Sequence, residues 1–220
     1  MGDFATFSLE FLAGLIVVSG WYVCFVRYNR RKAAETILWI KAAFCGYAQV
    51  VGVHWRSAST FDVRLRLATQ GFQQTHIRVR LMPREFALNW LLSKVRKQQE
   101  VIVFEADLDS PPAFNLEVHN QRWCARTRRK NKALPKKAAV ETCGPFVITT
   151  RRDWQREITS MMNALVASRD SDFLSVSFRR VSPHISATVP LKSLAPQQQC
   201  GNELFQVLRE LADCAGASRF

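Results

Sequence analysis

The sequence predicts an α+β protein in which a single N-terminal transmembrane helix precedes an α+β domain. Two observations support this fold class. Residues Phe4–Val26 form an apolar run of 23 residues with one charge, Glu10. Further along, segments in which apolar residues alternate at period two are mixed with segments in which they recur at helical spacing. With 48% hydrophobic residues the chain has enough apolar surface for a core, which excludes a wholly disordered or collagen-like protein.

The run Phe4–Val26 is predicted to be a membrane anchor. About 20 apolar residues cross a bilayer core as a helix, so the length suffices. A secretory signal peptide would have a basic front and a small-residue cleavage site, and the run shows neither. The alternative is a buried core helix of a soluble protein. Four cations follow as a stop-transfer flank and predict an N-terminus outside and a cytoplasmic C-terminal domain: Arg27, Arg30, Arg31 and Lys32.

The charge of the part after the anchor indicates anionic partners. All 31 Lys and Arg lie from Arg27 onward, against 16 Asp and Glu, which gives this part a net charge of +15. A domain this basic beside a membrane attracts anionic lipid head groups or RNA phosphates. The six cysteines contain no Cys-x-x-Cys pair, which fits reducing cytosol better than a disulfide scaffold.

Residues 33–53 are predicted to form a helix that follows the anchor after a short basic break and ends near Gly52. The segments 61–67 (F-D-V-R-L-R-L) and 76–81 (H-I-R-V-R-L) alternate strictly around a loop with Gly71, which predicts a β-hairpin. One face of this hairpin would be apolar. The other would gather four arginines that need an anion or a carboxylate partner, because like charges across strands destabilise a sheet: Arg64, Arg66, Arg78 and Arg80.

A further helix is predicted from Pro83 to Lys97, since proline suits the first helical position. Its inward-facing residues are expected to be Phe86, Trp90, Leu91 and Val95. Strands are then predicted at residues 101–106 and 114–118, followed by a basic helix at 121–134 and a linker at 135–145.

The rest of the chain repeats this order. We predict a strand at 146–150 and a capped helix at 150–168. Two strands follow at 174–178 and 186–191, and a last helix at 202–215. Strand–helix–strand–strand–helix would then occur twice, so the domain is predicted to contain two βαββα pseudo-repeats, or else to show this order by chance. The predicted organisation is an anchor at 1–32, a first α+β half at 33–134, a linker at 135–145 and a second α+β half at 146–220.

The segment Gln121–Lys137 is strongly basic, with eight cations, no acid, and Trp123 near its start. Arginine forks bind phosphates, and an aromatic ring stacks on bases or lies at a membrane interface. This segment is predicted to bind RNA or anionic lipid, unless it is a solvated loop. Its cations are Arg122, Arg126, Arg128, Arg129, Lys130, Lys132, Lys136 and Lys137.

No motif in the sequence indicates catalysis, a cofactor, a metal or a small-molecule substrate. Glycine-rich phosphate loops, a serine nucleophile elbow and closely spaced histidine pairs are absent. His76 and His119 would meet only across a sheet, and Cys143 has no adjacent base. The alternative is an enzyme of another type that uses Cys143 or three acids near the end of a strand, Glu105, Asp107 and Asp109. For these acids, a role in an ordinary turn is favoured over a Mg²⁺ site.

Three further features are a helix with Trp39 after the basic flank, the segment I-R-V-R-L-M-P-R-E-F-A-L-N-W-L-L-S-K-V at Ile77–Val95, and the strand V-I-V-F-E-A at Val101–Ala106. In order and hydrophobic pattern, Leu12–Leu134 resembles the cytosolic domain of the calumin family, coiled-coil-containing ER membrane proteins of the ribosome-bound multipass translocon. The acidic luminal region and charged coiled-coil tail of that family have no counterpart in these residues. The resemblance implies a membrane-tethered binding domain near the translation or insertion machinery, and not an enzyme.

Two functions are therefore expected. In the first, the domain is a scaffold whose basic face binds ribosomal RNA or a membrane-protein partner. In the second, it lies on anionic lipid through Arg27–Lys32 and Arg122–Lys137.

Overall fold

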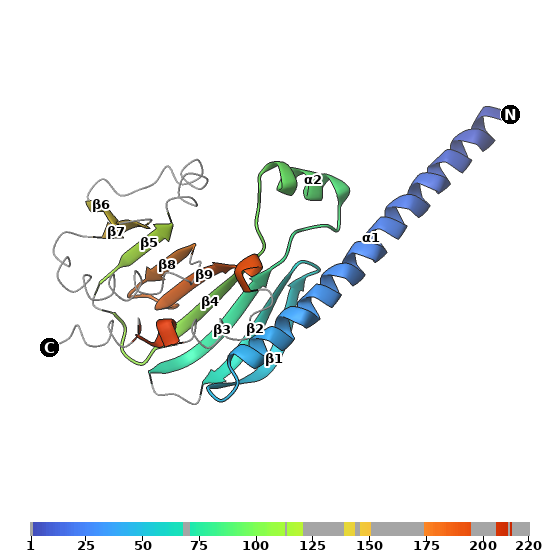
Figure 1. Cartoon of the computed structure of the whole chain (residues 1–220). Coiled ribbons are helices and arrows are strands. Elements are labelled where there is room, and N and C mark those ends of the chain that lie inside the picture. The colour runs from blue at the N-terminus through green and yellow to red at the C-terminus, as the bar shows by residue number, and fades with distance from the viewer. Residues whose placement is uncertain are drawn as a thin grey trace.

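The computed structural model describes residues 2–67, 71–112, 114–120, 139–143, 146–150, 174–194, 206–210 and 212. These residues form a long helix and a sheet (Figure 1). In chain order the elements are α1 (Gly2–Ala43), β1 (Ala48–Ser57), β2 (Thr60–Leu67), β3 (Phe72–Arg80), α2 (Ala87–Val95), β4 (Val101–Leu108), β5 (Leu116–Asn120), β6 (Ala139–Cys143), β7 (Phe146–Thr150), β8 (Ser175–Phe178), β9 (Ile185–Pro190) and the 3₁₀ helix η2 (Leu191–Leu194).

The strands form one nine-stranded sheet in the order β1-β2-β3-β4-β9-β8-β5-β7-β6, and neighbouring strands are antiparallel. The α+β class and the N-terminal apolar helix are therefore as predicted. The two predicted halves do not form separate sheets, because β4 pairs with β9 and β5 lies between β8 and β7. The stretch expected as a linker, 135–145, contains strand β6, and this prediction was wrong.

The predicted hairpin is present as β2 and β3, and its strict alternation separates the two faces of the sheet. Val63 and Leu65 on β2 and Ile77 and Val79 on β3 are buried on the inner face. The C-terminal part of α1 packs on this face, and the ring of Phe44 stacks on Phe104 of β4 with centroids 6.3 Å apart. Apolar burial between helix and sheet thus forms the core.

Helix α1 runs without interruption from the apolar segment into the core. The predicted break at Arg27–Lys32 is absent, because arginine and lysine are good helix formers. Its N-terminal part extends away from the sheet (Figure 1), and the segment Leu9–Ala43 is long and apolar enough to cross a membrane. The apolar window is not buried inside the fold, unlike that of a soluble core helix.

The prediction of a helix over residues 33–53 was wrong beyond Ala43. Gly46 adopts a positive φ of 86°, a conformation that favours glycine and ends the helix in a turn. The chain then reverses into β1, which pairs along β2. Gly52 lies inside β1 and does not end the helix.

The helix expected from Pro83 to Lys97 is shorter, and its expected orientation was wrong. Helix α2 begins at Ala87. Phe86, Leu91 and Val95, expected inside, are 57%, 53% and 72% exposed. Trp90 alone of the four is half-buried, against α1.

The carboxylate of Glu100 ties α1 to the sheet domain. It is buried and forms ion pairs with Lys32 of α1 and with Arg84, 3.1 Å away, on the connection from β3 to α2. Its Oε1 atom also accepts a hydrogen bond from the backbone N–H of Met82. One buried acid therefore joins α1 to the connection between β3 and α2.

Other predicted elements are confirmed or lie outside the described residues. The strands expected at 101–106, 146–150, 174–178 and 186–191 correspond to β4, β7, β8 and β9, and that expected at 114–118 overlaps β5. Residues 206–210 and 212 of the last predicted helix are helical, and Leu208 and Ala212 join the core. The predicted helices at 121–134 and 150–168, with the cations Arg122 to Lys137, lie outside the described residues, apart from Thr150 at the end of β7.

Candidate anion-binding face of the sheet

The outer face of β1–β4 is polar because the same alternation that buries the apolar residues turns the charged ones outward. In the registers of β2, β3 and β4, Asp62 is opposite Arg78, Arg64 is opposite His76, and His76 is opposite Glu105. Asp62 and Arg78 are therefore directly opposite and of opposite charge, which stabilises the pairing of β2 with β3.

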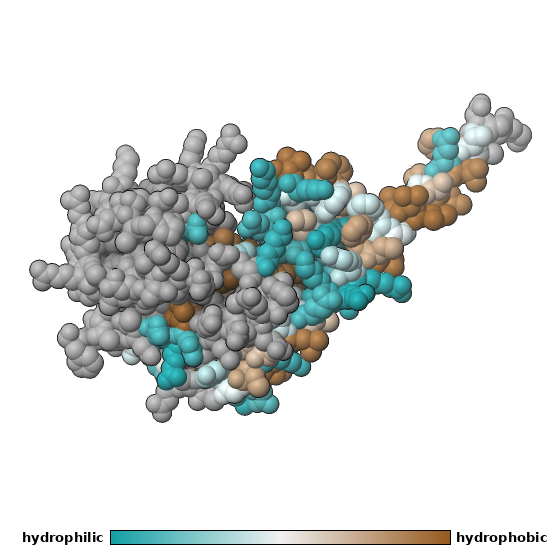
Figure 2. Space-filling view, in the orientation of Figure 1, coloured by the Kyte–Doolittle hydropathy of each residue, from teal (hydrophilic) through white to brown (hydrophobic). Residues whose placement is uncertain are grey.

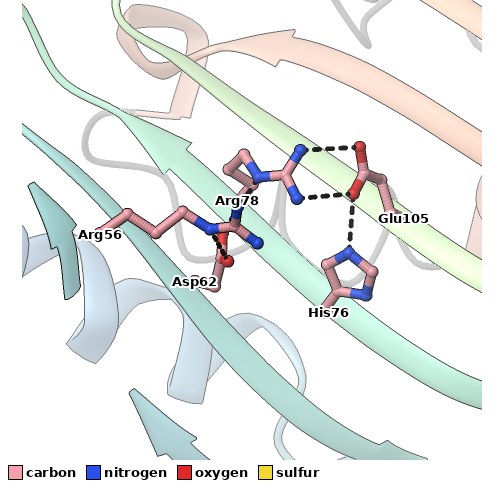
Figure 3. Close-up of polar contacts among 5 residues, drawn as sticks. All are labelled: Arg56, Asp62, His76, Arg78 and Glu105. Atoms are coloured by element: carbon pink, nitrogen blue, oxygen red, sulfur yellow. Dashed lines mark hydrogen bonds and ion pairs between the residues drawn. The ribbon is translucent and has the colours of Figure 1, made fainter. Parts of the chain in front are cut away.

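Five side chains on this face form a connected network (Figure 3). Asp62 accepts from Nε of Arg56 at 2.5 Å and from Nε of Arg78 at 3.1 Å. The Arg78 guanidinium also reaches both carboxylate oxygens of Glu105, each at 3.3 Å. His76 Nε2 lies 2.7 Å from Glu105 Oε2. The prediction that the arginine face needs a carboxylate partner is thus confirmed for Arg78.

The network is sheltered from water at its centre. The Asp62, Glu105 and Arg78 side chains are 11%, 14% and 20% exposed, whereas Arg56 is 56% exposed. Burial by itself raises the pKa of Asp62, but hydrogen bonds and charge attraction from Arg56 and Arg78 outweigh it. The pKa of Asp62 is therefore below its ordinary value, and the carboxylate is ionised at neutral pH.

A hollow of about 550 Å³ opens beside this network, between β1, β2 and β3. Arg64 and Arg66 line it together with Arg56, Asp62 and His76. Arg64 and Arg66 are exposed, and within the described part of the chain their side chains make no hydrogen bond or ion pair. Side chains held in ion pairs therefore line one side of the hollow, and the guanidinium groups of Arg64 and Arg66 are available to bind an anion such as phosphate in a bidentate manner.

The other predicted site residues are dispersed. Arg80 is exposed at the end of β3 and does not line the hollow. Of the flank cations, Lys32 pairs with Glu100, Arg30 stacks on Trp55 at 5.4 Å and Arg31 lies 3.7 Å from Glu35, while Arg27 is exposed.

Of the three acids considered for metal binding, two have other partners in the structure, and the third, Asp107, has one buried carboxylate oxygen, Oδ1, without a hydrogen-bond partner among the described residues. Glu105 belongs to the ion-pair network, and Asp109 accepts a hydrogen bond from the backbone N–H of Gly71, as a turn acid does. Among the described residues no group of three or more His, Cys, Asp or Glu is arranged to hold a metal ion. His76 and His119 do not meet, because β4, β9 and β8 separate their strands.

Two members of the network were missed by sequence reasoning. Asp62 was within reach, since the alternation F-D-V-R-L-R-L places it on the same face as Arg64 and Arg66. Arg56 was not, because the end of β1 was assigned to no element and its neighbours to a helix. Its position depends on the pairing of β1 with β2.

Replacing Asp62 with asparagine is expected to lower the free energy of unfolding by about 2–3 kcal/mol, because Arg78 keeps only one ionic partner in a sheltered position. The matched control is Glu35→Gln, which breaks the exposed pair with Arg31 at 3.7 Å on α1. Both of those side chains are more than half exposed, 67% and 86%, so that loss should stay below about 1 kcal/mol. Urea unfolding at pH 7 measures both, and equal losses would contradict the account.

Asp62 and a second carboxylate of the sheet, Glu117, predict a loss of stability in acid. The hydrogen bond with His119 lowers the pKa of Glu117 most, burial opposes it, and Arg179, 3.0 Å away, lowers the pKa further, to about 2. A lowered pKa gives stability that is fully present above the unfolded values, 3.8 for Asp62 and 4.5 for Glu117, and is lost as the pH falls below them. The stability difference between wild type and Asp62→Asn should accordingly shrink below pH 3.8. A difference that stays constant down to pH 2 would refute the assignment.

Comparison with known proteins gives no further guide to the role of this face: no protein-family model matches the chain, and no curated protein matches its sequence.

Proposed function

We propose that this chain is a single-pass membrane protein whose sheet domain binds the phosphate groups of structured RNA in the hollow, by binding rather than catalysis. In this proposal α1 spans the bilayer with its N-terminus outside, and the cations after Val26 keep the domain on the cytoplasmic side. The observation that carries the RNA part is the pair Arg64 and Arg66, exposed side by side without an ionic partner in the described chain.

The hollow's position supports RNA over the lipid head groups of the same membrane. The C-terminal end of β3 leads to Met82 and Arg84, which contact Asn29 and Trp21 of α1. His76, which is opposite Arg64 in the hollow, lies four residues before Arg80, about 13 Å away along the strand. Figure 1 shows β1–β4 running in the same general direction as α1, so this distance leads away from the membrane. It exceeds the screening length of about 8 Å at physiological salt.

Ribosomal RNA is the first RNA to test, because the resemblance to the calumin family implies a place beside the ribosome. The full chain in nanodiscs of zwitterionic lipid is mixed with ribosomes or with a structured ribosomal RNA fragment. We expect binding at about 50 mM salt that weakens steeply toward 200 mM and is abolished by RNase. Association that resists RNase, or binding to anionic vesicles alone, would contradict the proposal and favour a membrane-protein or lipid partner.

The orientation has its own test. Protease added to sealed membrane vesicles should digest the sheet domain only when the cytoplasmic side faces outward. Digestion in vesicles of the opposite orientation would show that the domain lies on the other side.

A further inference from the structure

Helix α2 exposes a continuous apolar stripe. Leu88, Leu91, Leu92 and Val95 recur at helical spacing and lie on one face. Their exposed fractions range from 49% for Leu92 to 74% for Leu88, and Phe86 just before the helix is also exposed. Burying apolar surface contributes about 25 cal/mol of free energy per Å², and a stripe left in water loses this contribution. This face therefore needs apolar surroundings.

Those surroundings are suggested by where α2 is attached. Trp90 of α2 packs edge-on against Trp21 of α1 with ring centroids 6.1 Å apart, and Phe86 lies 6.5 Å from Tyr22. Trp21 Nε1 donates a hydrogen bond to the carbonyl oxygen of Arg84 at 3.1 Å. Figure 2 shows the apolar residues over α2 and those of the extended part of α1 on the same visible side of the molecule.

These contacts place α2 near the end of the apolar run of α1, five residues before Val26. Residues 4–20 precede the contact at Trp21 and, at 1.5 Å per residue, span about 25 Å of helix. That length fills most of a hydrocarbon core about 30 Å thick. Trp21, Tyr22 and Trp90 then occupy the interfacial belt in which tryptophan and tyrosine are enriched.

The polar edge of α2 fits the same location. Lys94 extends over the Trp90 ring at 5.1 Å, and exposed Arg96 and Lys97 follow at the C-terminal end. Arg27, exposed on α1, lies about one and a half turns beyond the aromatic contacts of Trp21 and Tyr22. Cations with apolar stems at this depth can reach head-group phosphates while the neighbouring leucines stay among acyl chains.

We infer that α2 is an in-plane membrane helix. Its stripe of Leu88, Leu91, Leu92 and Val95 inserts into the membrane leaflet that faces the sheet domain. The inference rests on the span of α1 proposed above. It gives the domain a second contact with the bilayer, so that α1 and the sheet packed on it cannot tilt freely against the membrane and the hollow is held away from the surface.

Site-specific photocrosslinking in the full chain tests this. Benzoylphenylalanine is placed at Leu91, at Val181 and at Val17, in protein reconstituted into phosphatidylcholine–phosphatidylglycerol vesicles. Val181 is 76% exposed but lies between β8 and β9, so it controls for exposure, and Val17, 69% exposed on α1, controls for the span. We expect lipid adducts at Leu91 and Val17, about tenfold more abundant than at Val181.

The three positions separate the possible failures. Adducts at Val17 without adducts at Leu91 would overturn the inference and leave the anchor intact. An absence of lipid adducts at Val17 as well would overturn the anchor itself. A second variant, Leu88→Gln with Val95→Gln, should reduce the Leu91 adduct severalfold, and an unchanged yield would also count against insertion of the stripe.

Discussion

Replacing Glu100 with glutamine is expected to lower the free energy of unfolding by about 3–5 kcal/mol. The carboxylate is 8% exposed and pairs with Arg84, which is itself only 15% exposed, and with Lys32 on α1. A neutral amide leaves both cations without their counterion in a sheltered place. Because these contacts join α1, β3 and α2, the loss should also loosen α1 from the sheet.

Chemical unfolding of the full chain in detergent micelles, followed by tryptophan fluorescence, measures the effect. Glu35→Gln is the matched control, since Glu35 pairs with Arg31 on the same helix but both side chains are more than half exposed. The control should lose less than about 0.5 kcal/mol. Similar losses for the two variants would mean that Glu100 does not hold the elements together.

Replacing Arg64 and Arg66 together with glutamine is expected to weaken RNA binding at physiological salt by about tenfold or more. The two side chains line the hollow and take part in no ion pair of the described structure, so their removal should leave the fold intact. Surface substitutions of this kind change stability by about 0.5 kcal/mol or less. Binding of a fluorescent ribosomal RNA fragment gives the affinity, and the urea midpoint shows whether the fold is retained.

The matched control removes the same charge elsewhere. Arg96→Gln with Lys97→Gln also lowers the net charge by two, but at the end of α2 and outside the hollow. It should leave RNA affinity within about twofold of wild type, since long-range attraction is screened. Equal losses in both double variants would mean that overall charge, and not the hollow, binds RNA.

Much of the fold could be predicted from local pattern. The alternation in 61–67 and 76–81 gave the hairpin and its two faces, because period two fixes which side chains share a side of a strand. Strand β1 was missed because its residues Ala48–Ser57 include a bulge near Gly52 and do not alternate cleanly. The interleaving of β5 between β7 and β8 depends on long-range pairing, for which a single sequence carries no local signal.

In the candidate site, too, some features could be predicted from local sequence pattern and others depend on long-range strand pairing. Arg64, Arg66 and Arg78 were predicted from the outer face of the hairpin, but which of them pairs with a carboxylate depends on the alignment of β2 with β3 and β4. The orientation of α2 could not be predicted either. Its leucines have the pattern of a core helix, but in the fold Trp90 faces Trp21 of α1 and the leucines are exposed. The pattern is the same for a core and for a bilayer, because both are apolar.

The salt dependence of RNA affinity tests the central claim most directly. Each phosphate neutralised contributes about 0.7–0.9 to the slope of log affinity against log salt. We predict that Arg64→Gln with Arg66→Gln lowers this slope by about 1.4–1.8, and that Arg96→Gln with Lys97→Gln leaves it unchanged. A slope that is the same in wild type and in the Arg64–Arg66 double variant would show that the hollow holds no phosphate, and the proposed function would fail.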